Sequence, residues 1–459
     1  MSRTSPTGHS KLILPALEEI AIKTKLIIRK SPRFSADAFL MSSLFAVTSG
    51  KGSLNQIVQN LMGRVLRPMS RQSLFERFSP KSTAFMQSVL QDLMEQPYQS
   101  TRPALARSGI RRIIVEDASS QVLPKSNAEE FPAHGNHYGQ TAGVKIDFGY
   151  DLLSGTMVSH TLEQATTQDK IIGKELLVQV MPGDLVLRDM GYFILDEFTA
   201  IEDLGAKWLT RLPLTTGVVL EDEMALEKTL KKSKESTLEL TVYAGEQRKK
   251  CRLVAVRTAP EVAEKRRRER RQKAKKNGKQ ACPKGLARDG WHLMLTNLNQ
   301  EEATVGQLAE VYRARWAVEI QFRSWKQALN LTKALKRKSN EHHIQALVLA
   351  AMITHQLGMK MATIMMKQVG RSRLSFEKLY DNLAQELLKL QSLTDFIDFA
   401  PDPRHITRDK RKGCITHRIR HYSLNLTRMG AYQANYDQRP SHDPNPILLH
   451  PNHHSFSGS

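Results

Sequence analysis

The sequence of 459 residues contains only three cysteines, and no two of them form a CxxC pair. Cys251, Cys282 and Cys414 lie far apart, which argues against a disulfide framework and against a zinc finger. No apolar run approaches the roughly 18 residues needed to span a bilayer. The first residues also lack the long apolar core and the cleavage pattern of a secretory signal. We therefore expect a cytoplasmic, nucleoid-associated protein with no membrane partner.

Acidic residues are scarce relative to basic ones. The chain has 68 Lys and Arg against 46 Asp and Glu, a formal net charge of +22. Hydrophobic residues make up 40%, a normal share for a folded protein, so the charge sits on a globular body. A large basic excess predicts a polyanionic partner, with nucleic acid favoured over an anionic membrane.

Residues 1 to about 105 have helical spacing. The stretch from Ser53 to Ser79 predicts two short helices joined by a turn, with Ser70 as the N-cap of the second. This pattern is compatible with a helix-turn-helix in which Arg71, Gln72 and Arg77 approach DNA. An ordinary helical bundle explains the same pattern equally well.

The character of the sequence changes at Arg111. RRIIVEDASS predicts a buried strand that ends at Asp117, and residues 142–164 predict a hairpin. A helical stretch, an apolar strand ending in Asp189, a helix and a further strand follow, which together predict a mixed α/β core. Both aspartates would lie at strand ends, where an aspartate is often only a turn residue.

Residues 214 to 290 predict a β-rich insertion. Ten Lys or Arg lie between Lys265 and Lys279, and we interpret this run as a mobile, solvated loop that contacts phosphates. A strand from Trp291 follows, and an apolar, Met-rich helix over 342–366 predicts packed core. Residues from about 400 onward are basic and predict a flexible tail.

The stretch from Thr304 to Asn330, TVGQLAEVYRARWAVEIQFRSWKQALN, predicts one long helix with Thr304 as its N-cap. Four residues fall within roughly 60° of one face of that helix: Tyr312, Arg315, Glu319 and Lys326. A solvated face with ion pairs would explain any two of them. One carboxylate among two cations and a phenol also suits a metal-binding acid beside a phosphate backbone.

Only a fold can bring Asp117, Asp189 and Glu319 together, because they are 72 and 130 residues apart. Three carboxylates suit two Mg²⁺ or Mn²⁺ ions about 3.5–4 Å apart for in-line phosphoryl transfer. Arg315 and Lys326 could neutralise the adjacent phosphates.

These residues resemble a known family, the DDE transposases of bacterial insertion sequences that carry the Y-R-E-K signature. The signature Y-x2-R-x3-E-x6-K stands here as YRARWAVEIQFRSWK, and IIVEDAS and VLRDMGYF support the match. The resemblance covers about residues 35 to 380. It implies a ribonuclease H-like mixed-sheet core with a β-rich insertion, a helical N-terminal domain and a helical C-terminal region.

The resemblance also implies an activity. Family members bind the terminal inverted repeats of an element, cleave the DNA there, through a hairpin in some relatives, and join the 3′ ends to target DNA. It implies a homodimer on paired double-stranded ends. The metal-binding triad carried over by position is Asp117, Asp189 and Glu319.

The remaining site residues follow from the same resemblance. Tyr312, Arg315 and Lys326 would contact the phosphates near a flipped base, and Trp291 would stack on that base. Core packing of Trp291 is an equal alternative.

The expected organisation has a DNA-binding N-terminal domain, a core in two parts around the insertion, a helical region and a tail. The boundaries are 1–105, 106–213, 214–290, 291–335, 336–400 and 401–459. Two other functions are compatible with the fold. A catalytically silent DNA-binding regulator or domesticated relative would lack one acid of the triad. A metal-dependent nuclease or resolvase would not need Tyr312, Arg315 and Lys326 in register.

Overall fold

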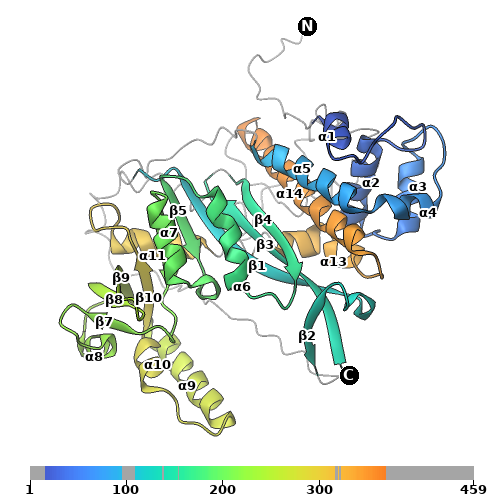
Figure 1. The fold of residues 1–459 in the computed structure, drawn as a ribbon. Helices are drawn as coiled ribbons and strands as arrows, with labels where there is room; N and C mark the ends of the chain where they lie inside the picture. Colours follow the sequence, from blue (N-terminus) through green and yellow to red (C-terminus); the bar gives the residue numbers. More distant parts are fainter. Residues whose placement is uncertain are drawn as a thin grey trace.

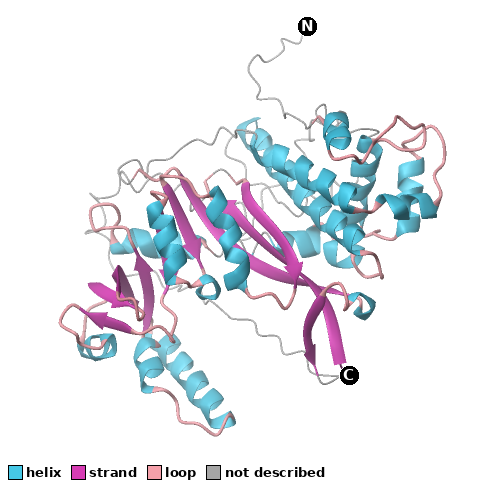
Figure 2. Cartoon of the chain, in the orientation of Figure 1, coloured by secondary structure: helices cyan, strands magenta, loops and turns pink. Residues whose placement is uncertain are grey.

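The computed structural model describes residues 16–95, 109–136, 139–153, 155–315, 319 and 322–368. Helices gather at one end of the molecule and strands run through the rest (Figure 2). The long helix α14 joins the N-terminal helices, because it packs against α2 and α5 (Figure 1). The helices of this bundle are α1 (Leu17–Lys23), α2 (Ala36–Ser49), α3 (Leu54–Met62), α4 (Arg71–Arg77), α5 (Pro80–Glu95) and α14 (Glu341–Gln368).

Local sequence signals set the bounds of these helices. The Ser35 side chain caps α2 by accepting a bond from the Ala38 amide at 3.1 Å, and Gly50 ends the helix in the left-handed region at φ 70°. All residues of α2 except Asp37 and Ser49 are buried, so it is the central helix of the bundle. The predicted Met-rich helix is α14, and its residues from Ala346 to Ile353 are completely or almost completely buried.

A single mixed sheet crosses the rest of the chain. Its order is β2-β3-β1-β5-β6-β10-β9-β8-β7, with β4 paired to β3. Strands β1, β5 and β6 are parallel, and the other pairs are antiparallel. The strands are β1 (Arg112–Leu123), β2 (Pro132–Asn136), β3 (Gly139–Asp151), β4 (Met157–Gln164), β5 (Asp184–Arg188), β6 (Lys207–Arg211), β7 (Val218–Leu220), β8 (Thr237–Ala244), β9 (Lys249–Arg257) and β10 (Trp291–Thr296).

The strands β4, β3, β1, β5 and β6 form the predicted ribonuclease H-like mixed-sheet core, and this prediction of the fold class is confirmed. Helices α6 (Asp169–Ile172) and α7 (Leu195–Asp203) lie in front of it, and α11 (Val305–Ala314) and α13 (Leu331–Ala334) lie behind (Figure 1). The two faces of the sheet therefore belong to two separate hydrophobic cores. Short 3₁₀ helices complete this part: Lys125–Asn127, Gly173–Gln179 and Met190–Tyr192.

The insertion is not a separate sheet. Strand β10 follows the insertion in sequence but lies between core strand β6 and insertion strand β9. Three helices accompany these strands: α8 (Leu226–Lys232), α9 (Pro260–Lys276) and α10 (Pro283–Arg288).

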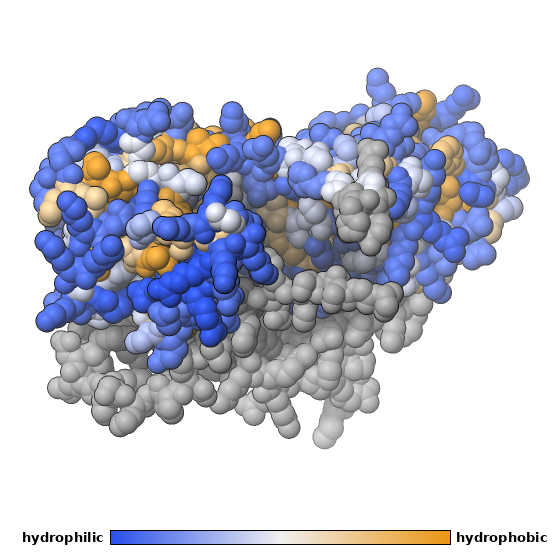
Figure 3. Space-filling view, turned by 90° about the horizontal axis from the view of Figure 1, so that it is seen from below, coloured by the Kyte–Doolittle hydropathy of each residue, from blue (hydrophilic) through white to orange (hydrophobic). Residues whose placement is uncertain are grey.

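The prediction of a mobile loop for the basic run is wrong, because most of the run forms helix α9. Arg270 holds α9 in place by two bonds to the Asp289 carboxylate, at 2.7 and 2.6 Å. Arg267 adds a bond to the Leu286 carbonyl at 3.2 Å. The face of the molecule on which α9 and α10 project is rich in hydrophilic side chains (Figure 3).

Two other predicted elements have different bounds. Strand β1 does not end at Asp117, because its pairing with β3 continues to Leu123. The helix predicted to run to Asn330 also has other bounds: α11 ends at Ala314, Glu319, Phe322 and Arg323 are helical, and a short π-helix occupies Ser324–Ala328. The predicted N-cap Thr304 is confirmed, as its side chain accepts from the Gln307 amide at 3.3 Å. Within the described residues, no helix is long and apolar enough to cross a membrane.

Candidate active site

Parallel strands β1 and β5 bring Asp117 and Asp189 to the same level of the sheet. The register pairs Val115 with Leu187, so the two aspartates lie two residues further along each strand. Side chains alternate between the faces of a strand, which places both aspartates on the face that α11 covers. Asp189 follows β5 directly and accepts a bond from the Met190 amide.

The segment after α11 brings Arg315 and Glu319 to the same place. Arg315 donates from Nη1 to Asp117 Oδ2 at 3.4 Å and from Nη2 to Glu319 Oε1 at 3.2 Å. Two aromatic side chains anchor this segment, because Phe322 and Trp325 pack on Phe148 of β3 with ring centroids 4.9 and 4.6 Å away. The guanidinium of Arg315 thus bridges two carboxylates that the sequence predicted to share a site.

The electrostatics of Asp117 connect all three acids. The pKa of its carboxyl is raised to about 7. Burial is the largest cause, Arg315 and the Ala118 amide oppose the rise, and the charges of Asp189 and Glu319 add to it. Carboxylates suit a divalent cation. In the described part of the chain, however, no three potential ligands stand close enough to hold a metal ion. The three carboxylates are therefore suitable metal ligands by chemical type. In this structure, however, the Arg315 guanidinium lies between the carboxylates of Asp117 and Glu319.

Tyr312 and Lys326 face the same strands. The Tyr312 hydroxyl donates to the Arg188 carbonyl at 3.4 Å, and Lys326 Nζ donates to Ser119 Oγ at 2.7 Å and to the Ser120 carbonyl at 2.9 Å. Burial lowers the pKa of Lys326. The predicted grouping of these side chains on one side is present, although α11 itself ends at Ala314. Ser119 is a neighbour that the sequence did not single out.

A buried ion cluster lies on the opposite face of the sheet, one residue away from each aspartate. Arg188 is fully buried and pairs with Glu116 and Glu197, each at 2.5 Å. Burial raises the pKa of Glu116 well above its usual value, and Arg188 opposes this rise. On each strand, neighbouring residues therefore serve opposite faces of the sheet. Glu116 and Arg188 belong to the buried ion cluster, and Asp117 and Asp189 belong to the candidate active site. The lone arginine in the apolar strand LVLRD was the available signal for this cluster.

A second ion pair joins the same two strands four residues earlier. Arg112 lies opposite Asp184 in the register and donates to its carboxylate at 2.8 and 2.6 Å. Nearby, Tyr192 donates to the buried carboxylate of Asp147, whose pKa burial raises to about 7. Polar groups thus fix β1, β3 and β5 around the aspartates.

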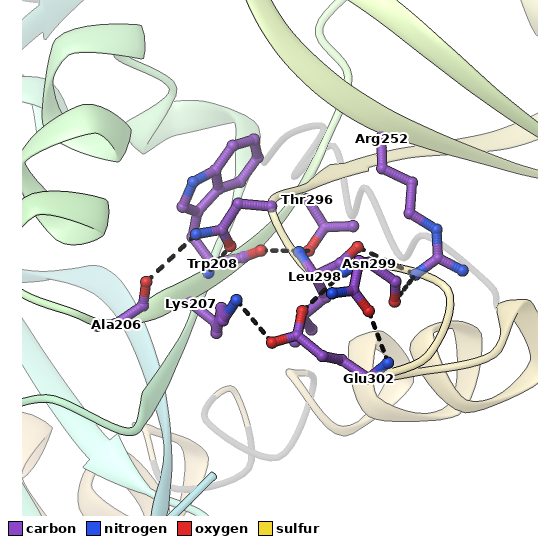
Figure 4. A network of polar contacts seen from close by, with 9 residues as sticks. Ala206, Lys207, Trp208, Arg252, Thr296, Leu298, Asn299 and Glu302 are labelled. Atoms are coloured by element: carbon purple, nitrogen blue, oxygen red, sulfur yellow. Dashed lines mark hydrogen bonds and ion pairs between the residues drawn. The ribbon is translucent and has the colours of Figure 1, made fainter. Parts of the chain in front are cut away.

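A network of polar contacts holds the loop that leads from β10 into α11 (Figure 4). Asn297 accepts from the Trp208 amide at 2.9 Å and donates to the Ala206 carbonyl at 3.2 Å. Lys207 pairs with Glu302 at 2.7 Å, and Arg252 donates to the Leu298 and Asn299 carbonyls. This loop fixes where α11 starts, and hence where Tyr312 and Arg315 lie.

Three predicted DNA contacts are placed apart from the acids. Trp291 is 4% exposed in the core of the insertion, and the Arg257 guanidinium covers its ring at 4.2 Å. A base could stack on the ring only after Arg257 moves. In this structure Trp291 is therefore packed in the core, which is one of the two arrangements considered from the sequence. In the helical bundle, Arg71 is exposed, whereas Arg77 donates to the Leu26 carbonyl at 3.1 Å and stacks on Phe34. Arg77 is therefore not a free recognition side chain.

Comparisons with known proteins give a family and several relatives. The family model "Transposase DDE domain" matches residues 108–354, more than half of the chain. The transposase for insertion sequence element IS231E of Bacillus thuringiensis subsp. finitimus is 26% identical, over 79% of this chain and 81% of that protein. The transposase for IS1151 of Clostridium perfringens is 24% identical, over 82% and 84%. Among solved structures, the Drosophila P element transposase strand transfer complex matches with a TM-score of 0.19 and 11% identity, over 92% and 97%, which is too loose to inform the fold.

Proposed function

The chain belongs to the transposase DDE domain family, and from that premise we propose that it moves an insertion sequence by cutting and rejoining DNA. It is a DDE transposase, an enzyme of phosphoryl transfer. We propose that it binds the terminal inverted repeats of its own element as a homodimer, cleaves there and joins the 3′ ends to target DNA. A hairpin on the element side is the expected intermediate. The names of the relatives, transposases for insertion sequence elements, support this proposal.

The observation that carries the proposal is the coupling of three acids from separate segments: Arg315 bridges Asp117 and Glu319, and the charges of Asp189 and Glu319 both act on Asp117. We expect these residues to hold two Mg²⁺ or Mn²⁺ ions, because three oxygen ligands suit hard divalent cations. When bound, the ions would activate the attacking water or 3′-hydroxyl and stabilise the leaving oxygen. The pKa of Asp117 is raised mainly by burial, and Arg315 offsets this only in part, so a further positive charge at this carboxylate would be favourable, which agrees with such a role.

The cations of the same site have a second role in this proposal. Arg315 presents a planar fork that matches a phosphate as well as it matches a carboxylate. Lys326 lies on the same side, beside Ser119. We expect Arg315, Lys326 and Tyr312 to contact phosphates near the scissile bond. Arg315 would then leave the two carboxylates, which would become available as ligands.

The test is a cleavage assay with a duplex that carries the ends of the protein's own element, in Mg²⁺ and in EDTA. Glu319→Gln should abolish cleavage, by about three orders of magnitude or more, because a ligand of the reacting centre is lost. It should leave binding of the end intact. Glu310→Gln, on α11 and without an ion pair to any described residue, is the matched control and should cleave normally.

The products decide between the candidate routes. A hairpin on the element side would support the complete cut-and-paste route. Metal-dependent nicking without a hairpin would keep the three acids but change the route. Nicking by the Glu319→Gln variant at the normal rate would contradict the assignment. End binding without cleavage by the unaltered protein would favour the silent regulator.

A further inference from the structure

The helical bundle carries a groove that no part of the proposed active site uses. Its lining residues come from the loop that joins α1 to α2, from helix α4 and from the start of α5. The groove has a volume of about 660 Å³. Four cations line it, together with four serines and one acid, Glu76. The cations are Lys25, Arg33, Arg77 and Lys81.

The charge in this groove is largely uncompensated. Lys25, Arg33 and Lys81 are exposed, and none of them forms an ion pair with a described residue. The carboxylate of Glu76 accepts a bond from Gln72 at 3.1 Å and so points along its own helix. The lining therefore offers three free cations to a ligand from solvent.

The loop that forms one wall is held in a fixed conformation. Leu26, Ile27 and Phe34 are buried, whereas the cations between them face outward. Arg77 braces the loop from α4, because it bonds the Leu26 carbonyl and stacks on Phe34 at 4.6 Å. Lys25 adopts the left-handed region at φ 59°, which is uncommon for a lysine. A braced loop loses little conformational freedom when it binds a ligand.

We infer that this groove is a binding site for the phosphodiester backbone of duplex DNA. Cations and serine hydroxyls are the groups that contact phosphate oxygens, and they carry no information on base sequence. Among polyanions, duplex DNA is the partner that the proposed transposase must hold, and the inference rests on that function. It also revises the sequence-based prediction for this domain, since Arg77 acts as a brace and Lys25, Arg33 and Lys81 provide the contacts.

The test compares two triple variants of the full chain that lose the same charge. One is Lys25→Gln, Arg33→Gln, Lys81→Gln in the groove. The other is Lys228→Gln, Lys231→Gln, Lys232→Gln on α8, where all three lysines are exposed. Fluorescence anisotropy measures binding to the element-end duplex and to a scrambled duplex at several salt concentrations. Circular dichroism establishes that both variants are folded.

The groove variant should bind both duplexes more weakly, and its plot of log K against log salt should be shallower by about 3, close to one for each lost phosphate contact. The α8 variant should keep the slope of the unaltered protein. Equal slopes for the two variants would overturn the inference. Loss of binding to polyglutamate with an unchanged DNA slope would also overturn it, in favour of an acidic protein partner.

The same experiment separates this inference from the proposed function. Normal cleavage and an unchanged slope in the groove variant would reject the groove alone and leave the transposase proposal standing. Failure of the unaltered protein to bind or cleave any duplex would reject both.

Discussion

The burial of Asp117, an acid of the candidate site, makes the stability of the fold depend on pH. Its carboxyl is mostly buried, with 19% of the side chain exposed, and one arginine at 3.4 Å is its ion-pair partner among the described residues. Burial places its pKa at about 7, against 3.8 for an unperturbed aspartate. The folded chain therefore holds a proton more tightly than the unfolded chain does. It follows that the free energy of unfolding falls as the pH rises from about 4 through 7.

Asp117→Asn should therefore stabilise the protein at pH 8 in EDTA. The expected gain is about 1–3 kcal/mol, less than the full shift at 1.36 kcal/mol per pKa unit allows, because the group is partly solvated. The gain should shrink at pH 5, where the native aspartate is already protonated. Urea denaturation at the two pH values measures this difference.

Asp203→Asn is the control for this prediction, because Asp203 is exposed at the end of α7. Its effect on stability should depend on pH much less than that of Asp117→Asn. A less stable Asp117→Asn variant at pH 8 would show that the ion pair with Arg315 outweighs burial.

Helix α9 shows that a run of basic residues need not be a loop. Arg267 and Arg270 bond to residues at and after α10, whereas Arg268 is exposed to solvent. Asp289 has 6% of its side chain exposed, so loss of Arg270 would leave a buried carboxylate without its partner. The bidentate Arg270–Asp289 contact and the bond from Arg267 to the Leu286 carbonyl thus hold the middle of the helix.

Arg270→Ala should make α9 markedly easier to digest with trypsin. A cost of about 1–3 kcal/mol for the unpaired carboxylate corresponds to a several-fold to hundred-fold rise in the open population. Arg268→Ala removes the same charge from the outer side and should leave the digestion rate nearly unchanged. Equal rates for the two variants would mean that the Asp289 contact does not hold the helix. Mass spectrometry of the early fragments locates the cut.

At the scale of the whole molecule, the proposal implies that DNA and metal ions bind cooperatively. Arg315 occupies Asp117 and Glu319 in the free protein. A DNA phosphate that attracts this arginine would free both carboxylates, and by thermodynamic linkage the metal would tighten DNA binding by the same factor. The two equilibria should therefore be measured together.

Arg315→Ala should raise the affinity of the DNA-free protein for Mn²⁺, by about tenfold or more, if the arginine competes with the ion. Mn²⁺ titration followed by electron paramagnetic resonance measures it. Arg323→Ala is the matched control, since Arg323 is exposed in the same segment and carries the same charge. If the two variants bind Mn²⁺ with comparable affinity, Arg315 affects the ion only through its charge and does not compete for the carboxylates.

The sequence predicted the architecture because strand and helix periodicities are local. β1, the β3–β4 hairpin, β5, α7 and β6 all follow from such signals. The end of α11 at Ala314 and the π-helix at Ser324–Ala328 were missed, since an unbroken helical pattern contains no signal for tertiary contacts such as the packing of Phe322 and Trp325 on Phe148. The roles of the acids remain predictions. The bridging by Arg315 was not predictable, because only the fold brings Asp117 near it.

The two ion pairs between β1 and β5 have a consequence for how these strands align. Ile113, Ile114 and Val115 are all buried, so apolar burial hardly distinguishes this alignment from one shifted by a single residue. A register shifted by one residue would turn Asp117 to the opposite face of the sheet and present Glu116 in its place. Arg112–Asp184 and Glu116–Arg188 are four residues apart on both strands, and only one alignment satisfies both. The two ion pairs therefore specify the register of β1 against β5. A chain that folded in the shifted register would present Glu116, not Asp117, at the candidate active site.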